Sequence, residues 1–538
     1  MKNLLRWILI AMLLFSTLGC GLVANLFEDE EPTQEYYEED EESWEDDDTD
    51  ASEDDTTPEG DNVEDEESDS GAVGIFEPGE CEYEEEYDVD LECGYVVVPE
   101  NYDDPDGNQV YLAVTIVRSP GGARFDDPVV YLEGGPGGSA TADVEGWLEQ
   151  PFLNDRDLIL FDQRGTGWSE PSLNCIEMES GDEEELDAAQ ACYERLLDEG
   201  IDLTQYNSLV SAADLDVLRQ ALGYDEWNLL GVSYGTRLAL TVMRDHPQGI
   251  RSVILDSVYP PEVDAYEEEP INGVRAFEMV FAGCEADAAC RRAFPDLDQT
   301  LYTLLDDLQA NPVEFTYTDP WTDEEEDVYL DGVELAGAIF QALYDTATIP
   351  WIPYAIDQLT QETYEEAWTL LLGGEEASDY GWPHQEDDED LTDSEGHFYS
   401  VECYEELPFN DAAETSAMAE ESDSPLIPYL MPDTDSAFEI CAIWDVGAAP
   451  AIETEPVQSD ISTLALAGDY DPITPPAWAQ SAARYLPNSF YFEFSGVGHG
   501  VLDTECGQAL IADFLNNPRA KPNPRCLSQL GAPEFQVP

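Results

Sequence analysis

The stretch that decides the fold is residues 227–235, which read Trp-Asn-Leu-Leu-Gly-Val-Ser-Tyr-Gly. Its first six residues are mostly apolar and predict a buried strand, and residues 234–245 predict a helix directly after it. Gly231 and Gly235 flank Ser233 in the pattern G-x-S-x-G, where a tight strand-to-helix turn leaves no room for side chains. We therefore expect Ser233 to present its hydroxyl at the edge of a sheet, as a nucleophile.

Apolar runs on both sides of this stretch predict further strands of the same sheet. Several are continuous, as in parallel strands that are buried on both faces, and they alternate with helical patterns such as residues 212–222. A hairpin is expected before them, at residues 94–99 and 110–117. The other expected strands are residues 128–132, 157–161, 252–255, 464–467 and 490–494. The pattern predicts an α/β protein with a mostly parallel sheet that is flanked by helices.

The strand pattern is interrupted between residues 262 and 455, where helical periodicity prevails. We expect this segment, called the insertion below, to form a large, mainly helical lid. Residues 75–261 and 456–538 are then the N-terminal and C-terminal parts of one catalytic core.

His499 and Asp471 are the residues expected to activate Ser233. A serine hydroxyl near neutral pH needs a general base, and His499 lies in a Gly-rich loop just after the last expected strand. A carboxylate must orient this base, and Asp471 follows the strand before it. Asp469 and Asp256 also follow strands and remain open as alternatives. The order Ser, Asp, His is that of the α/β-hydrolase fold, which is the fold that the sequence predicts.

A second Gly-rich stretch, Glu-Gly-Gly-Pro-Gly-Gly-Ser at residues 133–139, follows one of the expected strands. A loop in this place supplies a main-chain N–H to the oxyanion of a tetrahedral intermediate. We expect Gly135 to be one donor of the oxyanion hole and Tyr234, the residue after the nucleophile, to be the other. The stretch lacks the Lys of a phosphate-binding loop, so a phosphate site is the weaker interpretation.

Together these motifs resemble those of a known peptidase family. Residues 133–139 are similar to the Gly-rich loops of proline iminopeptidases and tripeptidyl aminopeptidases, and Asp-Gln-Arg-Gly-Thr-Gly-Trp-Ser at 162–169 is similar to their D-Q-R-G-x-G-x-S segment. The D-P-x-T-P and G-H-G sequences around the expected acid and base follow in the same order. Cys284-x5-Cys290 resembles the tripeptidyl aminopeptidase lid, and residues 506–526 resemble the C-terminal region of that group. The resemblance implies a serine peptidase that removes residues or short peptides from free N-termini.

An aminopeptidase must hold the ammonium group of its substrate with a carboxylate. The candidates are Glu133, which stands where proline iminopeptidases carry His, and Glu267–Glu269 of the insertion. Asp162 and Arg164 are expected to hold loops together. Two other functions stay open. One is a carboxylesterase or lipase on the same residues, because fold and triad do not fix the acyl group. The other is a tethered binding protein with an idle site.

The eleven cysteines indicate disulfides and an oxidising compartment. Apart from Cys20 they fall into couples that are close in sequence, and buried reduced cysteines are the alternative. The expected pairs are Cys81–Cys93, Cys175–Cys192, Cys284–Cys290, Cys403–Cys441 and Cys506–Cys526.

No metal or organic cofactor is predicted, because the chain has no C-x-x-C pair and only four His. Besides His499 these are His246, at an expected helix end, and His384 and His397. The last two fall in acidic sequence of the insertion, where they could touch a substrate without belonging to the core of the site.

The first 20 residues predict export. A short basic region and an apolar run end at Cys20, as in the signal peptide of a bacterial lipoprotein, with Cys20 as the lipidated residue. A single membrane-spanning anchor is the alternative, because apolar residues resume after Cys20. Either one places the protein outside the cytoplasm, tethered to the cell membrane. Residues 21–74 are strongly acidic and are expected to form a disordered spacer.

The chain carries 123 acidic and 18 basic residues, which gives a net charge of -105. This charge argues against nucleic acid as a partner and against an anionic membrane surface bound through a basic patch. It fits carboxylates that keep the surface soluble, or an acidic field that gathers cationic substrates. The expected partners are short peptide substrates and, through the N-terminus, the membrane.

Overall fold

The computed structural model describes residues 74–81, 89–179, 185–319, 325–373 and 393–538. The expected signal peptide with Cys20, the acidic spacer apart from Gly74, and His384 lie outside the described residues.

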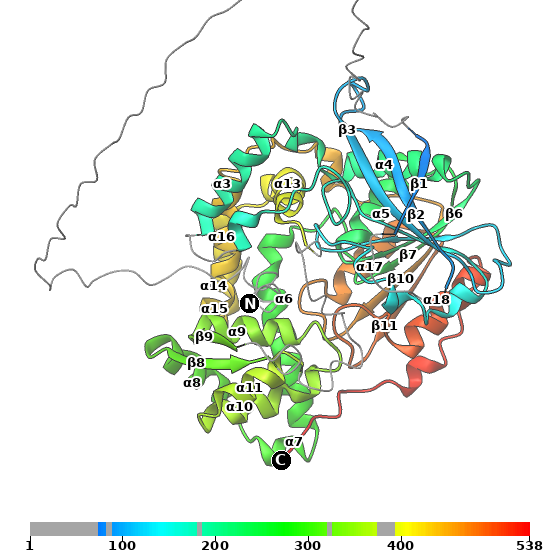
Figure 1. The fold of residues 1–538 in the computed structure, drawn as a ribbon. Helices are drawn as coiled ribbons and strands as arrows, with labels where there is room; N and C mark the ends of the chain where they lie inside the picture. The colour runs from blue at the N-terminus through cyan, green and yellow to red at the C-terminus, as the bar shows by residue number, and fades with distance from the viewer. Residues whose placement is uncertain (1–73, 82–88, 180–184, 320–324, 374–392) are drawn as a thin grey trace, which may run out of the picture. The chain divides into compact units, whose positions relative to one another are not determined.

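A nine-stranded sheet has the order β1-β2-β3-β5-β4-β6-β7-β10-β11 (Figure 1). β1, β2 and β3 pair antiparallel, and β3 pairs antiparallel with β5, whereas every pair from β5 to β11 is parallel. The strands are β1 (Phe76–Gly79), β2 (Leu91–Pro99), β3 (Gln109–Val117), β4 (Val129–Leu132), β5 (Leu158–Phe161), β6 (Trp227–Val232), β7 (Ile250–Asp256), β10 (Ser462–Gly468) and β11 (Ser489–Phe494). The predicted fold class and the strands expected from the apolar runs are confirmed.

Helices cover both faces of the parallel part, which explains why its strands are apolar without alternation. One face packs against α4 (Ser208–Ala221), α5 (Tyr234–Asp245) and α17 (Pro476–Tyr485). The other face packs against α18 (Glu505–Asn516). All four residues of β4 and of β5 are buried. Burial of this apolar surface, at about 25 cal/mol per Å², is the main stabilising contribution to the sheet.

Between β7 and β10 the chain leaves the sheet and forms the insertion, whose helices lie together in Figure 1. It has an apolar core of its own, where Phe277, Leu301 and Leu335 are buried. The insertion is mainly helical, as expected, but β8 and β9 form an antiparallel hairpin that was not predicted. Its elements are α6 (Ala265–Ala286), α7 (Cys290–Ala293), α8 (Leu297–Ala310), β8 (Val313–Thr318), β9 (Glu325–Leu330), α9 (Gly332–Ala342), α10 (Ile352–Thr360), α11 (Tyr364–Leu371), α13 (Glu395–Glu405), α14 (Ala412–Ser422), α15 (Ile427–Leu430) and α16 (Pro432–Cys441).

Five disulfides join the cysteines in the expected pairs. Each one fastens segments that are near in sequence, with separations of 6 to 38 residues. The pairs are Cys81–Cys93, Cys175–Cys192, Cys284–Cys290, Cys403–Cys441 and Cys506–Cys526. Cross-links of this kind stabilise a fold by restricting the unfolded chain.

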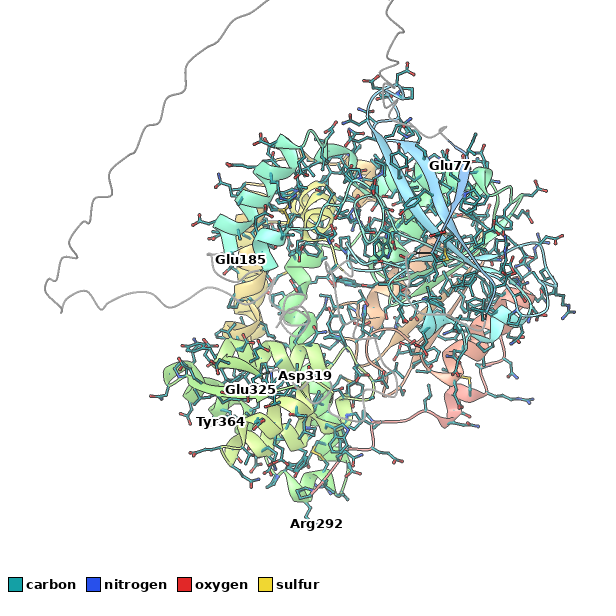
Figure 2. The ribbon with its side chains drawn as sticks, in the orientation of Figure 1. Glu77, Glu185, Arg292, Asp319, Glu325 and Tyr364 are labelled. Carbon is teal, nitrogen blue, oxygen red and sulfur yellow. A yellow bond between two sulfur atoms is a disulfide. The ribbon has the colours of Figure 1, made fainter. Side chains whose placement is uncertain are left out.

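Acidic side chains occur in the sheet and in the insertion alike. In Figure 2 the labelled Glu77 lies on β1, and Glu325 lies at the start of β9. The negative charge of the chain is thus not confined to the expected spacer. Among the helices of the described ranges, none combines the length and the apolar character needed to cross a membrane.

Candidate active site

Ser233 lies in the sharp turn between β6 and α5. Its backbone has φ 54° and ψ -126°, a conformation that costs a residue other than Gly roughly 1–3 kcal/mol. A Cβ at Gly231 would collide with the carbonyl O of Gly235, and one at Gly235 would collide with that of Leu132. The two glycines therefore permit the close approach of backbones that this turn requires.

The carboxyl ends of five neighbouring parallel strands carry the candidate site. β4 leads into the Gly-rich loop, β6 into Ser233 and β7 ends at Asp256, while β10 leads to Asp471 and β11 to His499. Because parallel strands end at one edge of the sheet, residues from distant parts of the sequence gather there.

His499 and Asp471 form a hydrogen-bonded pair. His499 Nδ1 is 2.9 Å from Asp471 Oδ2, and Asp471 also accepts hydrogen bonds from the main-chain N–H of Thr474 (2.8 Å) and from Thr474 Oγ1 (2.7 Å). Burial opposes both charges, but the attraction between them outweighs it. The pKa of Asp471 is therefore held below its ordinary value and the pKa of His499 above it. The ionised carboxylate orients the imidazole and stabilises its charged form.

The two alternative acids have other partners. Asp469 Oδ1 accepts a main-chain N–H from the loop before His499 at 2.7 Å. The Asp256 carboxylate accepts main-chain N–H groups from the loop after His499. Of these three carboxylates, Asp471 is the one that is hydrogen-bonded to the imidazole.

The Gly-rich loop lies against Ser233. A Cβ at Gly134 would stand 3.2 Å from Ser233 Cβ, so the backbone of the loop approaches the serine closely. The Gly134 N–H donates to Glu133 Oε1 at 2.8 Å, which leaves the N–H of Gly135 as the next donor along the loop. Tyr234 begins α5, and the N–H groups of a first helical turn have no partner within their helix. Tyr234 thus follows Ser233 directly, and Gly135 follows Gly134, which approaches Ser233; the role of their N–H groups as oxyanion donors stays a prediction.

Glu133 fixes the start of this loop. Its Oε1 accepts hydrogen bonds from the Tyr131 hydroxyl at 2.9 Å and from the Gly134 N–H. Burial raises the pKa of Glu133 to about 7, although both of these hydrogen bonds favour the ionised form. A cation beside Glu133 would favour that form further.

Glu267–Glu269 lie at the start of α6, and one of them is connected to the nucleophile turn. Glu268 Oε2 accepts the Trp478 Nε1–H at 2.7 Å, and Trp478 stacks on Tyr259 with ring centroids 5.8 Å apart. Both rings pack in one apolar cluster with Tyr234. The other two glutamates accept hydrogen bonds from distant parts of the insertion.

The insertion holds the loops of the acid and the base, which sequence reasoning missed. Arg275 of α6 donates to the carbonyl O of Asp469 at 2.7 Å and to that of Asp471. The carbonyl O of Tyr344 accepts the His499 N–H at 2.9 Å, and the two rings lie 4.8 Å apart between centroids. The hydrogen bonds use main-chain atoms of the site loops, so no motif in the sequence signals them.

Helix α13 links the Gly-rich loop to α5. Just before α13, the Ser394 N–H donates to the carbonyl O of Gly137 at 3.0 Å. At the other end, Glu405 and Glu406 form buried ion pairs with Arg237 of α5, at 3.3 and 2.7 Å. Both segments that supply the expected oxyanion donors are therefore fastened to one helix of the insertion.

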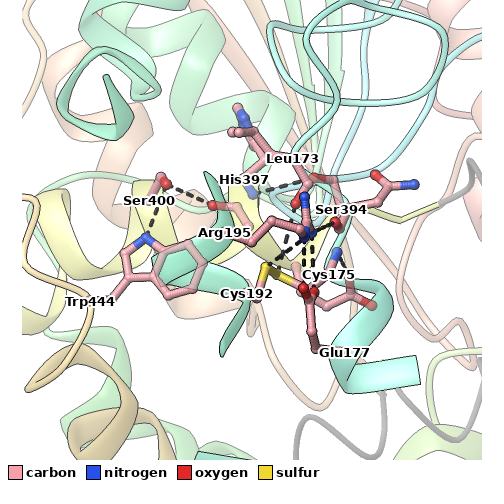
Figure 3. The surroundings of a disulfide bond; sticks show 12 residues. Leu173, Cys175, Glu177, Cys192, Arg195, Ser394, His397, Ser400 and Trp444 are labelled. Carbon is pink, nitrogen blue, oxygen red and sulfur yellow. Dashed lines mark hydrogen bonds and ion pairs between the residues drawn. A yellow bond between two sulfur atoms is a disulfide. The ribbon is translucent and has the colours of Figure 1, made fainter. Parts of the chain in front are cut away.

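The same helix lies beside a disulfide (Figure 3). Around Cys175–Cys192, Ser400 Oγ of α13 accepts the Trp444 Nε1–H at 3.1 Å. His397 is 0% exposed, and burial lowers its pKa to about 3, so its ring is neutral. The expectation that His397 could touch a substrate is wrong, because the side chain is enclosed in the packing of α13.

Asp162 and Arg164 hold loops together, as expected. Asp162 accepts the Ser139 hydroxyl at the end of the Gly-rich loop, at 2.9 Å. Arg164 makes two hydrogen bonds of 2.7 Å to the buried Asp214. Among the described residues, no group of His, Cys, Asp and Glu is arranged to hold a metal ion.

Comparison with known proteins places this site in a family. Residues 127–505, more than half of the chain, match the family described as alpha/beta hydrolase fold. A tripeptidyl aminopeptidase of Streptomyces coelicolor is 33% identical over 201 residues, 32% of this chain and 36% of that protein. Serine protease Hip1 of Mycobacterium tuberculosis is 31% identical over 223 residues, 38% of this chain and 42% of Hip1. Carboxylesterase B of Mycobacterium tuberculosis is 29% identical over 474 residues, 81% of this chain and 86% of that protein.

The matches to the two peptidases span less than half of their lengths. The family match is broader, because residues 127–505 include the Gly-rich loop, Ser233, Asp471 and His499. The sheet order, the turn at Ser233 and this match agree, and the chain belongs to the α/β hydrolase family as a serine hydrolase.

Proposed function

We propose that the protein is an exported serine aminopeptidase that removes single residues or short peptides from free N-termini. The observation that carries the hydrolase chemistry is the 2.9 Å hydrogen bond between His499 and Asp471, at the sheet edge that also holds the strained turn at Ser233. The peptidase activity is supported by the similarity to a tripeptidyl aminopeptidase and to serine protease Hip1.

The proposed reaction passes through an acyl-enzyme. His499 takes the proton of the Ser233 hydroxyl as its oxygen attacks the scissile carbonyl, and the N–H groups of Tyr234 and Gly135 stabilise the oxyanion. His499 then gives the proton to the leaving amine. Water attacks the acyl-enzyme by the same route, while Asp471 stays ionised and holds the imidazole.

We infer that Glu133 or Glu268 holds the substrate ammonium group. Glu133 is the first residue of the Gly-rich loop, so we infer that it would bind the ammonium group of a substrate that loses one residue. Glu268 lies in the insertion and suits a longer acyl group. If Glu133 binds the ammonium group, Glu133→Gln should lower kcat/KM for aminoacyl amides. If Glu268 binds it, Glu268→Gln should lower kcat/KM for tripeptidyl amides. A variant that lowers the turnover of free and N-acetylated substrates equally would exclude ammonium binding by that residue.

The deciding experiment is hydrolysis of aminoacyl and tripeptidyl fluorogenic amides, each with a free and a blocked N-terminus, by the wild type and by Ser233→Ala. We expect cleavage of the free-amine substrates alone, and its loss in the variant. Cleavage that persists in Ser233→Ala, or no preference for a free amine, would refute the proposal.

A carboxylesterase is the second candidate, because the match to Carboxylesterase B covers 81% of the chain. It predicts turnover of p-nitrophenyl esters that depends on Ser233, with no cleavage of the amides. The same enzyme preparation tested on both substrate classes separates the two functions.

We further propose that the protein is tethered outside the cytoplasm through a lipid on Cys20. The five disulfides support an oxidising compartment. Metabolic labelling with an alkyne fatty acid should mark the wild type and not Cys20→Ser. A wild type that stays in the membrane fraction without label would favour a membrane-spanning anchor instead.

A further inference from the structure

Asp256 stands at the centre of the candidate site without belonging to the expected triad. It ends β7, and in the sheet it is paired with Val232 of β6 on one side and Leu466 of β10 on the other. The residue is 0% exposed. Its carbonyl O accepts the main-chain N–H of Ser233 at 3.0 Å. The backbone of Asp256 therefore contacts the turn of the nucleophile directly.

The side chain of Asp256 contacts the loop of the base. Its two carboxylate oxygens accept the Val501 N–H at 3.0 and 2.9 Å, and one of them also accepts the Leu502 N–H at 2.8 Å. The next residue, Ser257, accepts the Gly500 N–H on its hydroxyl at 2.8 Å. Three successive N–H groups immediately after His499 are thus bonded to two successive residues at the end of β7.

We propose that Asp256 is a positioning residue for the reaction. Its carbonyl O holds Ser233, its carboxylate holds the loop of His499, and one residue thereby sets the geometry between nucleophile and base. This inference rests on the proposed roles of Ser233 and His499, and it applies equally to a peptidase and to an esterase.

The carboxylate also acts on the charge of His499. Burial raises the pKa of Asp256 to about 7, while its hydrogen bonds from Val501 and Leu502 and the charge of His499 favour the ionised form. The ionised carboxylate in turn favours the imidazolium. The other titratable groups facing this pair are Asp471 with Arg275 beyond it, Tyr344 on the imidazole ring, Tyr131 of β4, which faces Asp256, and Asp503, which itself faces Asp143 and Asp345.

Asp256→Asn tests this role, and Ser257→Ala is its matched control. Asn keeps the shape and the main-chain bond to Ser233, but it loses the charge and turns an N–H donor toward the loop. Ser257→Ala removes one acceptor from the same loop without a change of charge. The readout is the rate of Ser233 labelling by a fluorophosphonate as a function of pH, which needs no knowledge of the natural substrate. Ser233→Ala serves as the unlabelled blank.

We expect Asp256→Asn to slow labelling by about 10- to 100-fold, the loss typical of a hydrogen-bonded charge. The acidic limb of the labelling rate against pH should move to lower pH in this variant, because the imidazolium loses a neighbouring negative charge. Ser257→Ala should slow labelling and leave the limb in place. Labelling of Asp256→Asn with the rate and the limb of the wild type would overturn the inference.

Misfolding of Asp256→Asn and failure of the proposed function can each be told apart from failure of this inference. If Asp256→Asn does not fold, Asp256→Glu keeps the charge but lengthens the side chain by one methylene. It should slow labelling with the limb unchanged, and labelling at the wild-type rate would overturn the inference. A folded wild type that is not labelled at all would instead refute the proposed function.

Discussion

The hydrogen bond between His499 and Asp471 determines how the site responds to pH. Activity requires a neutral imidazole, and the pKa of His499 is raised above 6.5 by Asp471 in spite of burial. We expect kcat/KM to rise with pH along an acidic limb whose midpoint lies above 6.5. A midpoint at or below 6.5 in the wild type would contradict this prediction.

The orienting role of Asp471 can be tested separately. Asp471→Asn should lower kcat by about 10³- to 10⁴-fold, as loss of an orienting carboxylate does in serine proteases.

Thr474 supports the same pair, since its hydroxyl is 2.7 Å from Asp471 Oδ2 and 3.2 Å from His499 Nδ1. Thr474→Val keeps the shape and removes the hydroxyl, so we expect kcat to fall by about 10-fold or more. Thr474→Ser keeps the hydroxyl and should retain most of the activity. Equal activity of the Val variant and the wild type would show that the hydroxyl has no role.

Candidate site residues could be named from the sequence where a reactive side chain follows an expected strand. Ser233, Asp471 and His499 each follow an expected strand, and Ser233 and His499 also lie between glycines. The choice between Asp469 and Asp471 depends on which carboxylate turns toward the imidazole, and the two-residue spacing alone does not settle that. The carboxylate for a substrate ammonium group could not be identified, because the chain offers 123 acidic residues.

Helix α6 connects the insertion to the loop of Asp471, the proposed acid, through Arg275. The guanidinium donates to two carbonyl groups of the loop that carries Asp471. Arg275→Ala leaves both carbonyls without this partner, so we expect kcat to fall by about tenfold while most of the protein stays folded. Arg291→Ala is the control, because Arg291 is a half-exposed arginine of the same insertion whose ion pair with Glu285 is at 3.8 Å. Equal effects of both changes would exclude a specific role of Arg275.

Elements of the core could be predicted because their apolar runs are buried on both faces of the sheet. The hairpin of β8 and β9 was missed although Val-Glu-Phe-Thr-Tyr-Thr at residues 313–318 alternates with a period of two. The hairpin is short, and the sequence on both sides of it has helical periodicity, which predicts helices for the whole segment. How the insertion meets the core was not predictable, because its contacts with the site loops fall largely on main-chain groups.

The charge of the whole molecule should make its stability depend on salt. The carboxylates that give the net charge of -105 repel one another. Added salt screens this repulsion, with a Debye length of about 10 Å at 0.1 M. We therefore expect the Tm to rise as NaCl is added to a low-salt buffer, as measured by differential scanning fluorimetry. A Tm that falls with added NaCl would mean that ion pairs outweigh the repulsion.

Stability should also fall as the pH rises from about 5 to 8. Burial raises the pKa of Glu269 to about 7 and, together with the charge of Glu406, that of Glu402 to about 8. Between the ordinary value of 4.5 and these values the folded protein binds more protons than the unfolded chain, so the free energy of unfolding decreases with pH. Asp471, with its lowered pKa, opposes this trend only in more acidic solution. Glu402→Gln should flatten the dependence of Tm on pH, and an unchanged slope would exclude Glu402 as a cause.

The bonds between the insertion and the loops of the candidate site constrain which parts of the insertion can be exchanged. Arg275, Tyr344 and Ser394 lie on separate elements of the insertion, and each one holds a different loop of the core. The hairpin of β8 and β9 instead packs on α9 and α11, within the insertion itself. A change in the hairpin therefore leaves these bonds to the core intact, whereas a change in α6, in the segment after α9 or in α13 disturbs a loop of the candidate site. A chimera that carries a foreign insertion would lose activity unless the loops of its host were exchanged with it.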